Sequence, residues 1–124
     1  MFHQKVERCH WTAIESGLTS RGIPDSHYCL EGASGSFEYK KCAHWRVSMR
    51  PEQVGWIERQ LRSGGRVFIA VKRADDEVWL LHGRAARHIK VDGLRTLPKH
   101  SIFGMWKRQE IPWRAVRRLL WSKF

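Results

Sequence analysis

The predicted fold depends most on two short stretches, Gly22-Ile23-Pro24-Asp25 and Phe37-Glu38-Tyr39-Lys40. A glycine followed closely by a proline is typical of a tight turn, so we expect Asp25 at the start of a strand. The second stretch is expected on a neighbouring strand. Because side chains alternate across a strand, Glu38 and Lys40 point to one face and Tyr39 to the other. The pattern predicts that two carboxylates and one ammonium group converge.

Such a convergence suits the hydrolysis of a phosphodiester. That reaction needs a water made nucleophilic near neutral pH, and positive charge near the phosphate oxygens in the transition state. Asp25 and Glu38 offer hard oxygen ligands for Mg²⁺ or Mn²⁺, and Lys40 can orient or polarise the water. The backbone carbonyl of Tyr39 is a further expected metal ligand. Neither motif alone indicates a nuclease. For example, Glu-x-Lys on a strand is usually a solvated ion pair.

The order and spacing of these motifs resemble the PD-(D/E)XK nuclease superfamily, and within it the small stand-alone VRR-NUC endonucleases found in phage. The resemblance covers residues 11–82 and includes, in order, residues 11–15, 22–25, 38–40, 51–56, 64–65 and 66–72. Family members commonly have a leucine between the Glu and the Lys. Tyr39 stands there in this chain, which changes the back face of the strand and leaves the chemical groups in place.

The resemblance implies an α/β, restriction-endonuclease-like core of order α-β-β-β-α-β, with a mixed central sheet flanked by helices. It implies a Mg²⁺- or Mn²⁺-dependent endodeoxyribonuclease that acts as a homodimer on branched DNA such as four-way Holliday junctions, without a small-molecule cofactor. By the same resemblance Glu15, near the end of the first helix, is a metal ligand, and Gln53 positions the water or a phosphate. The alternatives are that Glu15 faces solvent, that Glu7 takes its place, and that Gln53 is a helix-surface residue.

The spacing of hydrophobic residues, and the Gly and Pro residues that end helices and strands, predict the elements of the core. A loosely helical pattern predicts a helix over about residues 5–20, followed by strands at 26–30 and 36–42 around a turn at 31–35. Pro51 and the Gly64-Gly65 pair bound a helix over 51–63. Strands are expected at 66–72 and 77–82, and a short third strand of the core has room in 44–49.

The chain is long enough for one domain, so we expect a single nuclease domain over 1–124, with a core at about 5–82 and an elaboration at about 83–124. Within the elaboration we expect a short helix at 83–90, a long basic loop at 94–109 and a last helix that begins at Pro112. This basic amphipathic helix, with Trp113 and Trp121, is a candidate for DNA contact or dimer packing.

The charge of the chain points to a polyanionic partner. Lys and Arg number 23 against 12 Asp and Glu, which gives a net charge of +11. With the nuclease motif, the expected partner is DNA. The residues expected to contact it are basic or aromatic neighbours of the motif, namely Arg21, Lys41, Trp45, Arg46 and Arg50. Trp45 could equally be a core residue.

No apolar run of about 18 residues and no signal peptide is evident, so the expected compartment is the cytoplasm, that of the host cell if the chain is phage-encoded. Cys9, Cys29 and Cys42 are expected as free thiols, because they are odd in number and a reducing compartment disfavours disulfides. Their spacing does not fit a zinc ribbon or finger. Two rival functions remain. One is a non-catalytic nucleic-acid-binding module that keeps the nuclease fold, and the other is a membrane-surface or partner-binding protein that uses the last helix.

Overall fold

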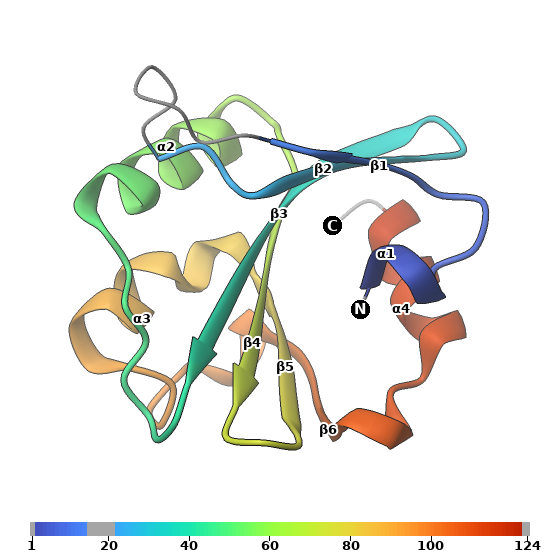
Figure 1. Cartoon of the computed structure of the whole chain (residues 1–124). Coiled ribbons are helices and arrows are strands. Elements are labelled where there is room, and N and C mark those ends of the chain that lie inside the picture. The colour runs from blue at the N-terminus through green and yellow to red at the C-terminus, as the bar shows by residue number, and fades with distance from the viewer. Residues whose placement is uncertain (1, 15–21, 123–124) are drawn as a thin grey trace.

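The computed structural model describes residues 2–14 and 22–122. It contains helices and strands in mixed order, with short 3-10 turns at Gly83–Ala85, Lys99–Ser101 and Arg108–Glu110. In chain order they are α1 (Phe2–Lys5), β1 (His10–Ala13), β2 (Ser26–Leu30), β3 (Ala33–Cys42), α2 (Pro51–Arg62), β4 (Val67–Arg73), β5 (Glu77–His82), α3 (Ala86–Asp92), β6 (Ile102–Lys107) and α4 (Trp113–Trp121) (Figure 1).

The described strands form one six-stranded sheet in the order β1-β2-β3-β4-β5-β6. β3 and β4 are parallel, and every other neighbouring pair is antiparallel. A parallel pair needs a crossover, which α2 supplies between β3 and β4. This is the mixed sheet flanked by helices that the sequence predicts, with the expected α-β-β-β-α-β order.

Helices cover both faces of the sheet (Figure 1), and each face carries its own hydrophobic core. On one face α2 and α3 pack through Ile57 and Ile89. On the other face α1 and α4 pack through Phe2 and Leu120, both fully buried. Because side chains alternate, β3 presents Glu38 and Lys40 towards α2 and presents aromatic residues to the opposite core.

The first helix is the main error of the sequence prediction. Over residues 5–14 the expected helix is replaced by the end of α1 and by β1, which pairs antiparallel with β2 in the register Trp11↔Tyr28. β1 is therefore the third strand of the core, and residues 44–49 contain no strand. Local spacing was misleading, because pairing with β2 decides the structure of residues 10–13 and the local pattern does not report that pairing. The rest of the expected helix falls in residues 15–21, outside the described residues.

The loop expected over 94–109 is also wrong, because it contains β6, which extends the sheet beyond β5. The residues after His82 thus build part of the sheet and both cores. α4 is fixed to the sheet by the Tyr28 hydroxyl, which donates to the Leu120 carbonyl at 2.7 Å. The apolar side of α4, with Val116 and Leu120 buried, packs on the sheet, which disfavours the membrane-surface alternative. Among the described helices, none combines the length and apolar character needed to span a bilayer.

Candidate functional site

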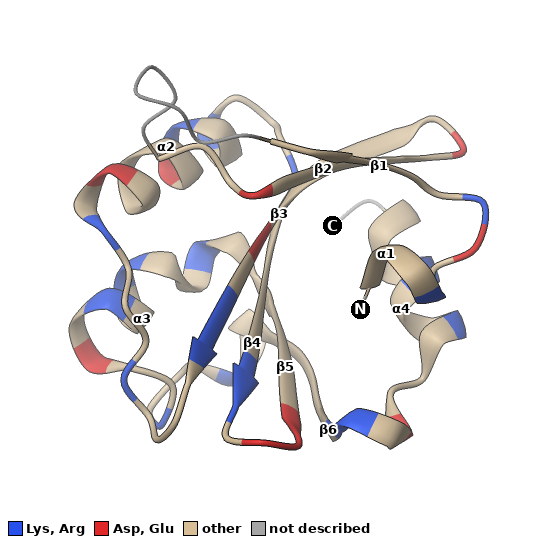
Figure 2. Ribbon diagram, in the orientation of Figure 1, with Lys and Arg blue, Asp and Glu red and all other residues tan. Residues whose placement is uncertain are grey.

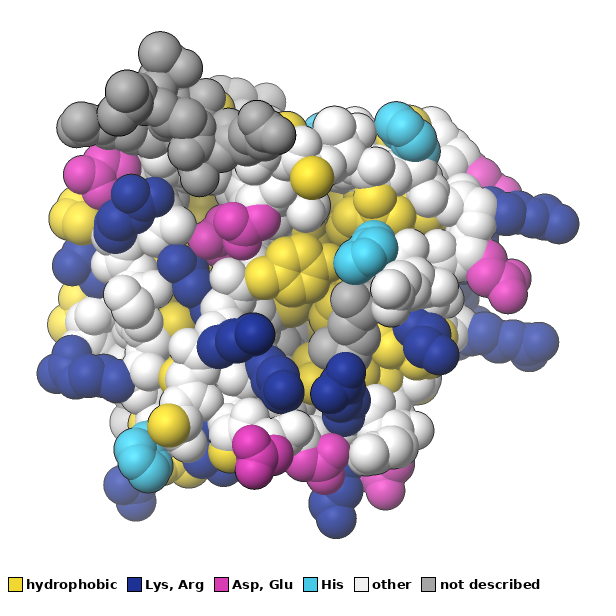
Figure 3. Space-filling model, viewed as in Figure 1, with side chains coloured by type: hydrophobic (Ala, Val, Ile, Leu, Met, Phe, Trp, Pro, Cys, Tyr) yellow, Lys and Arg dark blue, Asp and Glu magenta, His cyan; other side chains and the backbone are white. Residues whose placement is uncertain are grey.

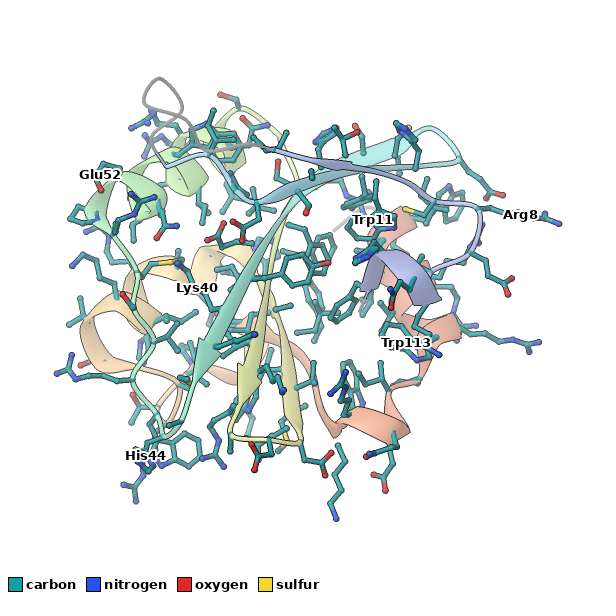
Figure 4. All side chains as sticks on the ribbon, viewed as in Figure 1. Arg8, Trp11, Lys40, His44, Glu52 and Trp113 are labelled. Atoms are coloured by element: carbon teal, nitrogen blue, oxygen red, sulfur yellow. The ribbon has the colours of Figure 1, made fainter. Side chains whose placement is uncertain are left out.

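The site forms where the start of β2, the middle of β3 and the first turn of α2 meet. Asp25 lies just before β2, Glu38 and Lys40 lie on β3, and Gln53 lies on α2. Figure 2 shows acidic positions at the start of β2 and in β3, and basic positions towards the ends of β3 and β4. In Figure 4, Lys40 lies on β3 beside these carboxylates. The structure therefore brings together four of the residues that the sequence predicts.

The two carboxylate-bearing residues hold each other through backbone amides. The Asp25 N–H donates to Glu38 Oε1 at 3.1 Å, and the Tyr39 N–H donates to Asp25 Oδ2 at 3.0 Å. No described residue donates to the other oxygen of Asp25, and the residue is exposed. Since the N–H and C=O of a strand residue point to the same side, the Tyr39 carbonyl is directed towards the Asp25 side of β3.

Gln53 connects α2 to the charged pair on β3. Its Nε2 donates to Glu38 Oε2 at 2.9 Å, while its Oε1 accepts from Lys40 Nζ at 3.0 Å and from the Arg50 N–H at 2.9 Å. Lys40 Nζ also lies 3.3 Å from Glu38 Oε2. The helix-surface alternative for Gln53 is thereby excluded, because the side chain is buried and every polar atom of its amide is engaged.

Gly22 explains how Asp25 reaches the site. Its φ is +83°, and its Cα faces the carbonyl of Glu52 so closely that any side chain there would overlap the backbone of α2. Only glycine combines this backbone conformation with this approach. The Gly-Ile-Pro-Asp turn is thus packed against the first turn of α2, the same turn that carries Gln53 (Figure 4 labels Glu52).

Burial shapes the electrostatics of the site. Glu38 is only 2% exposed. This burial, and next the negative charge of Asp25, raise the pKa of Glu38, while the ammonium of Lys40 acts in the opposite direction. Keeping Glu38 ionised therefore costs free energy in the folded protein, and a bound cation would reduce that cost.

The donor set fits a hard divalent ion. Mg²⁺ is commonly held by one or two carboxylates together with water and substrate phosphate oxygens, and Asp25, Glu38 and the Tyr39 carbonyl offer that chemistry. Within residues 2–14 and 22–122, no cluster of three or more His, Cys, Asp or Glu side chains surrounds a metal position. Glu15, the further expected ligand, lies outside the described residues. Its competitor Glu7 lies in the α1–β1 connection, where its carbonyl accepts from Arg117 of α4.

The residues expected to contact DNA have different surroundings. Lys41, Arg46 and Arg50 are exposed, and Arg21 lies outside the described residues. Trp45 is half-buried against the core, with the Arg73 guanidinium 3.9 Å from its ring centroid. These contacts favour the core alternative for Trp45.

Sequence reasoning missed a hollow of about 560 Å³ that adjoins the site through Tyr39 and Lys40. Its basic residues include Lys72, at the end of β4, and Arg108, after β6. Figure 3 shows hydrophobic side chains near the centre of this side of the molecule, with several Lys and Arg side chains below them, an acidic side chain at their upper left and a histidine at their right. The alternating pattern of β4 placed Lys72 on the Tyr39 face, but only the folded sheet brings Arg108 there.

Comparison with known proteins supports the architecture. No family model matches the sequence, and no curated protein matches it significantly. Among solved structures, the Holliday junction resolvase Hjc from the archaeal hyperthermophile Archaeoglobus fulgidus is similar, with a TM-score of 0.52. The chain has a resolvase-like fold. The similarity covers 87% of this chain and 80% of the resolvase at 9% sequence identity, so the two proteins share the fold and differ at most positions of their sequences.

Proposed function

We propose that the protein is a Mg²⁺- or Mn²⁺-dependent endodeoxyribonuclease that acts as a homodimer on branched DNA, four-way Holliday junctions above all. The observation that carries the proposal is the hydrogen-bonded group of Asp25, Glu38, Lys40 and Gln53 on a resolvase-like fold. The order of the motifs supports placing the chain in the PD-(D/E)XK superfamily, near the small VRR-NUC endonucleases of phage.

In this proposal each residue has one task. Asp25, Glu38 and the Tyr39 carbonyl would hold a divalent ion, which would supply positive charge and lower the pKa of bound water. Lys40 Nζ, fixed by Gln53 and Glu38, orients a water for attack on phosphorus. The water oxygen forms a bond to phosphorus as one ester P–O bond breaks; the attacking water gives up a proton to solvent, and the leaving oxygen takes up a proton from solvent. Glu15 is proposed as a further direct or water-mediated ligand.

The charge supports DNA as the partner. A net charge of +11 favours association with a polyanion, and affinity for phosphates should fall with added salt. Lys41, Arg46 and Arg50 are exposed next to the site elements and suit phosphate contacts. A homodimer suits a four-way junction, because two symmetric incisions need two sites at a fixed spacing.

The decisive experiment is cleavage of an end-labelled synthetic four-way junction and of a linear duplex of the same sequence, in Mg²⁺ and in Mn²⁺. Asp25→Asn is the test variant, because it removes the charge and keeps an oxygen that can accept from the Tyr39 N–H. Asp92→Asn is the matched control, since Asp92 is exposed at the end of α3. We expect paired incision of the junction by the wild type and by Asp92→Asn, and none by Asp25→Asn.

The other outcomes each change the proposal. Cleavage of both DNAs would keep the chemistry and remove the junction selectivity. Binding of both without cleavage in either metal would favour the non-catalytic binding module. Junction cleavage that is unchanged in Asp25→Asn would refute the assignment of Asp25.

A further inference from the structure

The hollow beside the site is built from aromatic side chains on the side of β3 opposite to Gln53. Phe2 of α1, Trp11 of β1 and Tyr39 of β3 line it, together with small residues of β2 and β4. Its volume of about 560 Å³ lies within the range of ordinary ligand pockets. Lys40 also lines the hollow, so the hollow and the carboxylate site share a border on β3. Figure 4 labels Trp11 and Lys40 on the two sides of this region.

Two lining residues retain unused hydrogen-bonding capacity. Trp11 Nε1 and the Tyr39 hydroxyl are buried, and neither has a hydrogen-bond partner among the described residues. Buried polar groups are normally paired, and unpaired ones call for an explanation such as a missing ligand. An indole N–H is a donor and a phenol is both donor and acceptor. Both atoms have almost no accessible surface, so a flat ligand whose edge carries oxygen or nitrogen acceptors reaches them only when it displaces the atoms that cover them.

The rim of the hollow selects for negative charge. Lys41, Lys72, Arg108 and His3 line it, and among the described residues no Asp or Glu belongs to its lining. Within the described part of the chain, none of these four side chains forms an ion pair. Aromatic rings surrounded by free cations are the combination that binds nucleotides in single strands, where bases stack and phosphates meet Lys and Arg.

We propose that this hollow is a pocket for one unstacked nucleobase of the DNA, with Trp11 and Tyr39 contacting the base and Lys41, Lys72 and Arg108 contacting its flanking phosphates. The inference rests on the proposed function, since it explains how a nuclease would favour branched DNA. A base in a continuous duplex must be unpaired and unstacked before it can enter. A base at a branch or bulge has already lost its pairing and much of its stacking, so it enters the pocket at the lowest free-energy cost.

The test uses a pocket probe that needs neither cleavage nor a junction. Binding is measured by fluorescence anisotropy in Ca²⁺ with three labelled DNAs: a linear duplex, the same duplex with one bulged thymine, and the same duplex with one bulged abasic site. Stacking of one base corresponds to roughly 5- to 100-fold in affinity. We expect the wild type to bind the thymine bulge about 10-fold more tightly than the abasic bulge.

Variants assign that preference to the pocket. Tyr39→Phe removes only the hydroxyl, and Trp11→Phe removes the indole N–H while keeping a ring in the core. Each should reduce the thymine-to-abasic ratio by about 3-fold or more, because the loss of one hydrogen bond is of that order. Trp56→Phe is the control for a tryptophan that packs on the other face of the sheet and does not line the hollow, and it should keep the ratio. Lys72→Ala should weaken all three DNAs, and exposed Lys99→Ala should weaken none.

Equal wild-type affinity for the thymine and abasic bulges would overturn the pocket, as would a ratio that Tyr39→Phe and Trp11→Phe leave unchanged. If these variants instead shift the sedimentation of the DNA-free protein without changing the ratio, the face contacts a second copy and the base pocket is wrong. The proposed function is judged separately by junction cleavage in Mg²⁺. Junction cleavage without a base preference would support the nuclease proposal and refute the base pocket. A base preference without cleavage would support the base pocket and refute the nuclease proposal.

Discussion

The amide of Asp25 donates to Glu38 Oε1 at 3.1 Å, so the residue that enters β2 is held by the residue at the centre of β3. Asp25 is exposed and Glu38 is almost completely buried. One carboxylate is thus accessible to solvent and ligands, and the other is fixed by hydrogen bonds from Asp25 and Gln53. This asymmetry gives the two residues different responses to pH, metal and mutation.

The first prediction concerns pH and metal together. A carboxyl whose pKa is raised on folding, as burial and Asp25 raise that of Glu38, contributes stability that is present below its unfolded pKa and is lost as pH rises through its folded pKa. The metal-free contribution of Glu38 should therefore fall as pH rises above about 4.5. Because a metal needs the ionised form, Mg²⁺ should raise the melting temperature more at about pH 8 than at about pH 5.

Thermal unfolding with and without MgCl₂ at both pH values measures this difference. Asp25→Asn is expected to lose the Mg²⁺-dependent increase at either pH, whereas Asp92→Asn should retain it. An increase of the same size at both pH values would show that protonation of Glu38 does not oppose Mg²⁺ binding between these pH values.

The second prediction concerns Gln53 as a positioning residue. Gln53→Ala leaves Glu38 without one donor and leaves Lys40 and the Arg50 N–H without their acceptor. We expect a loss of about 1–3 kcal/mol in the free energy of unfolding and roughly 10- to 100-fold in metal affinity or cleavage rate. Urea unfolding and Mg²⁺ titration of the cleavage rate measure both. Gln109→Ala, at an exposed position after β6, is the control and should change neither; equal effects in the two variants would contradict the role.

The nuclease motif could be predicted from sequence because its signals are local. Alternation alone places Glu38 and Lys40 on one face of β3, and the Pro51 and glycine boundaries define α2 within one residue of its observed end at Arg62. The hydrogen bonds between Asp25 and β3 link residues that are close in sequence. Spacing was therefore enough to predict their meeting.

The misassigned elements depend on distant partners. β1 is four residues long and is a strand because β2 provides its ladder. β6 contains Gly104, with Pro98 shortly before it, both of which weaken a strand pattern. In the fold, the ring of Trp106 covers Gly104 on this edge strand, which compensates for the missing side chain. The local sequence pattern reports neither the pairing of β1 with β2 nor that of β6 with β5.

The third prediction compares Gly22, in the turn that carries Asp25, with Gly32, in the turn between β2 and β3. The comparison separates the steric effect of an added side chain from the strain of a positive φ. Gly22 and Gly32 have φ values of +83° and +87°, so alanine is strained at both, at about 1–2 kcal/mol each. At Gly32 nothing lies within 4 Å of an added Cβ, whereas at Gly22 the Cβ would overlap the Glu52 carbonyl. Gly22→Ala should therefore displace the turn that carries Asp25 and lower cleavage by at least about 10-fold. Gly32→Ala should lose stability only.

Chemical denaturation and junction cleavage, measured on both glycine variants, distinguish these effects. The expected pattern is a similar loss of stability from the strained backbone, with an additional loss for Gly22→Ala and a cleavage defect in that variant alone. If Gly22→Ala cuts as well as Gly32→Ala, then the contact between the turn and α2 does not set the position of Asp25.

The last prediction compares two tyrosine hydroxyls on the same face of the sheet. The Tyr28 hydroxyl is fully buried and donates to the Leu120 carbonyl, and burial raises its pKa to about 12. The Tyr39 hydroxyl is buried with no partner among the described residues. Tyr28→Phe leaves a buried carbonyl unpaired and should cost about 1–3 kcal/mol, whereas Tyr39→Phe should cost less than about 0.5 kcal/mol. Urea unfolding followed by tryptophan fluorescence measures both. A large loss in Tyr39→Phe would mean that its hydroxyl already has a partner in the folded chain, and the free donor required by the base pocket would then be absent.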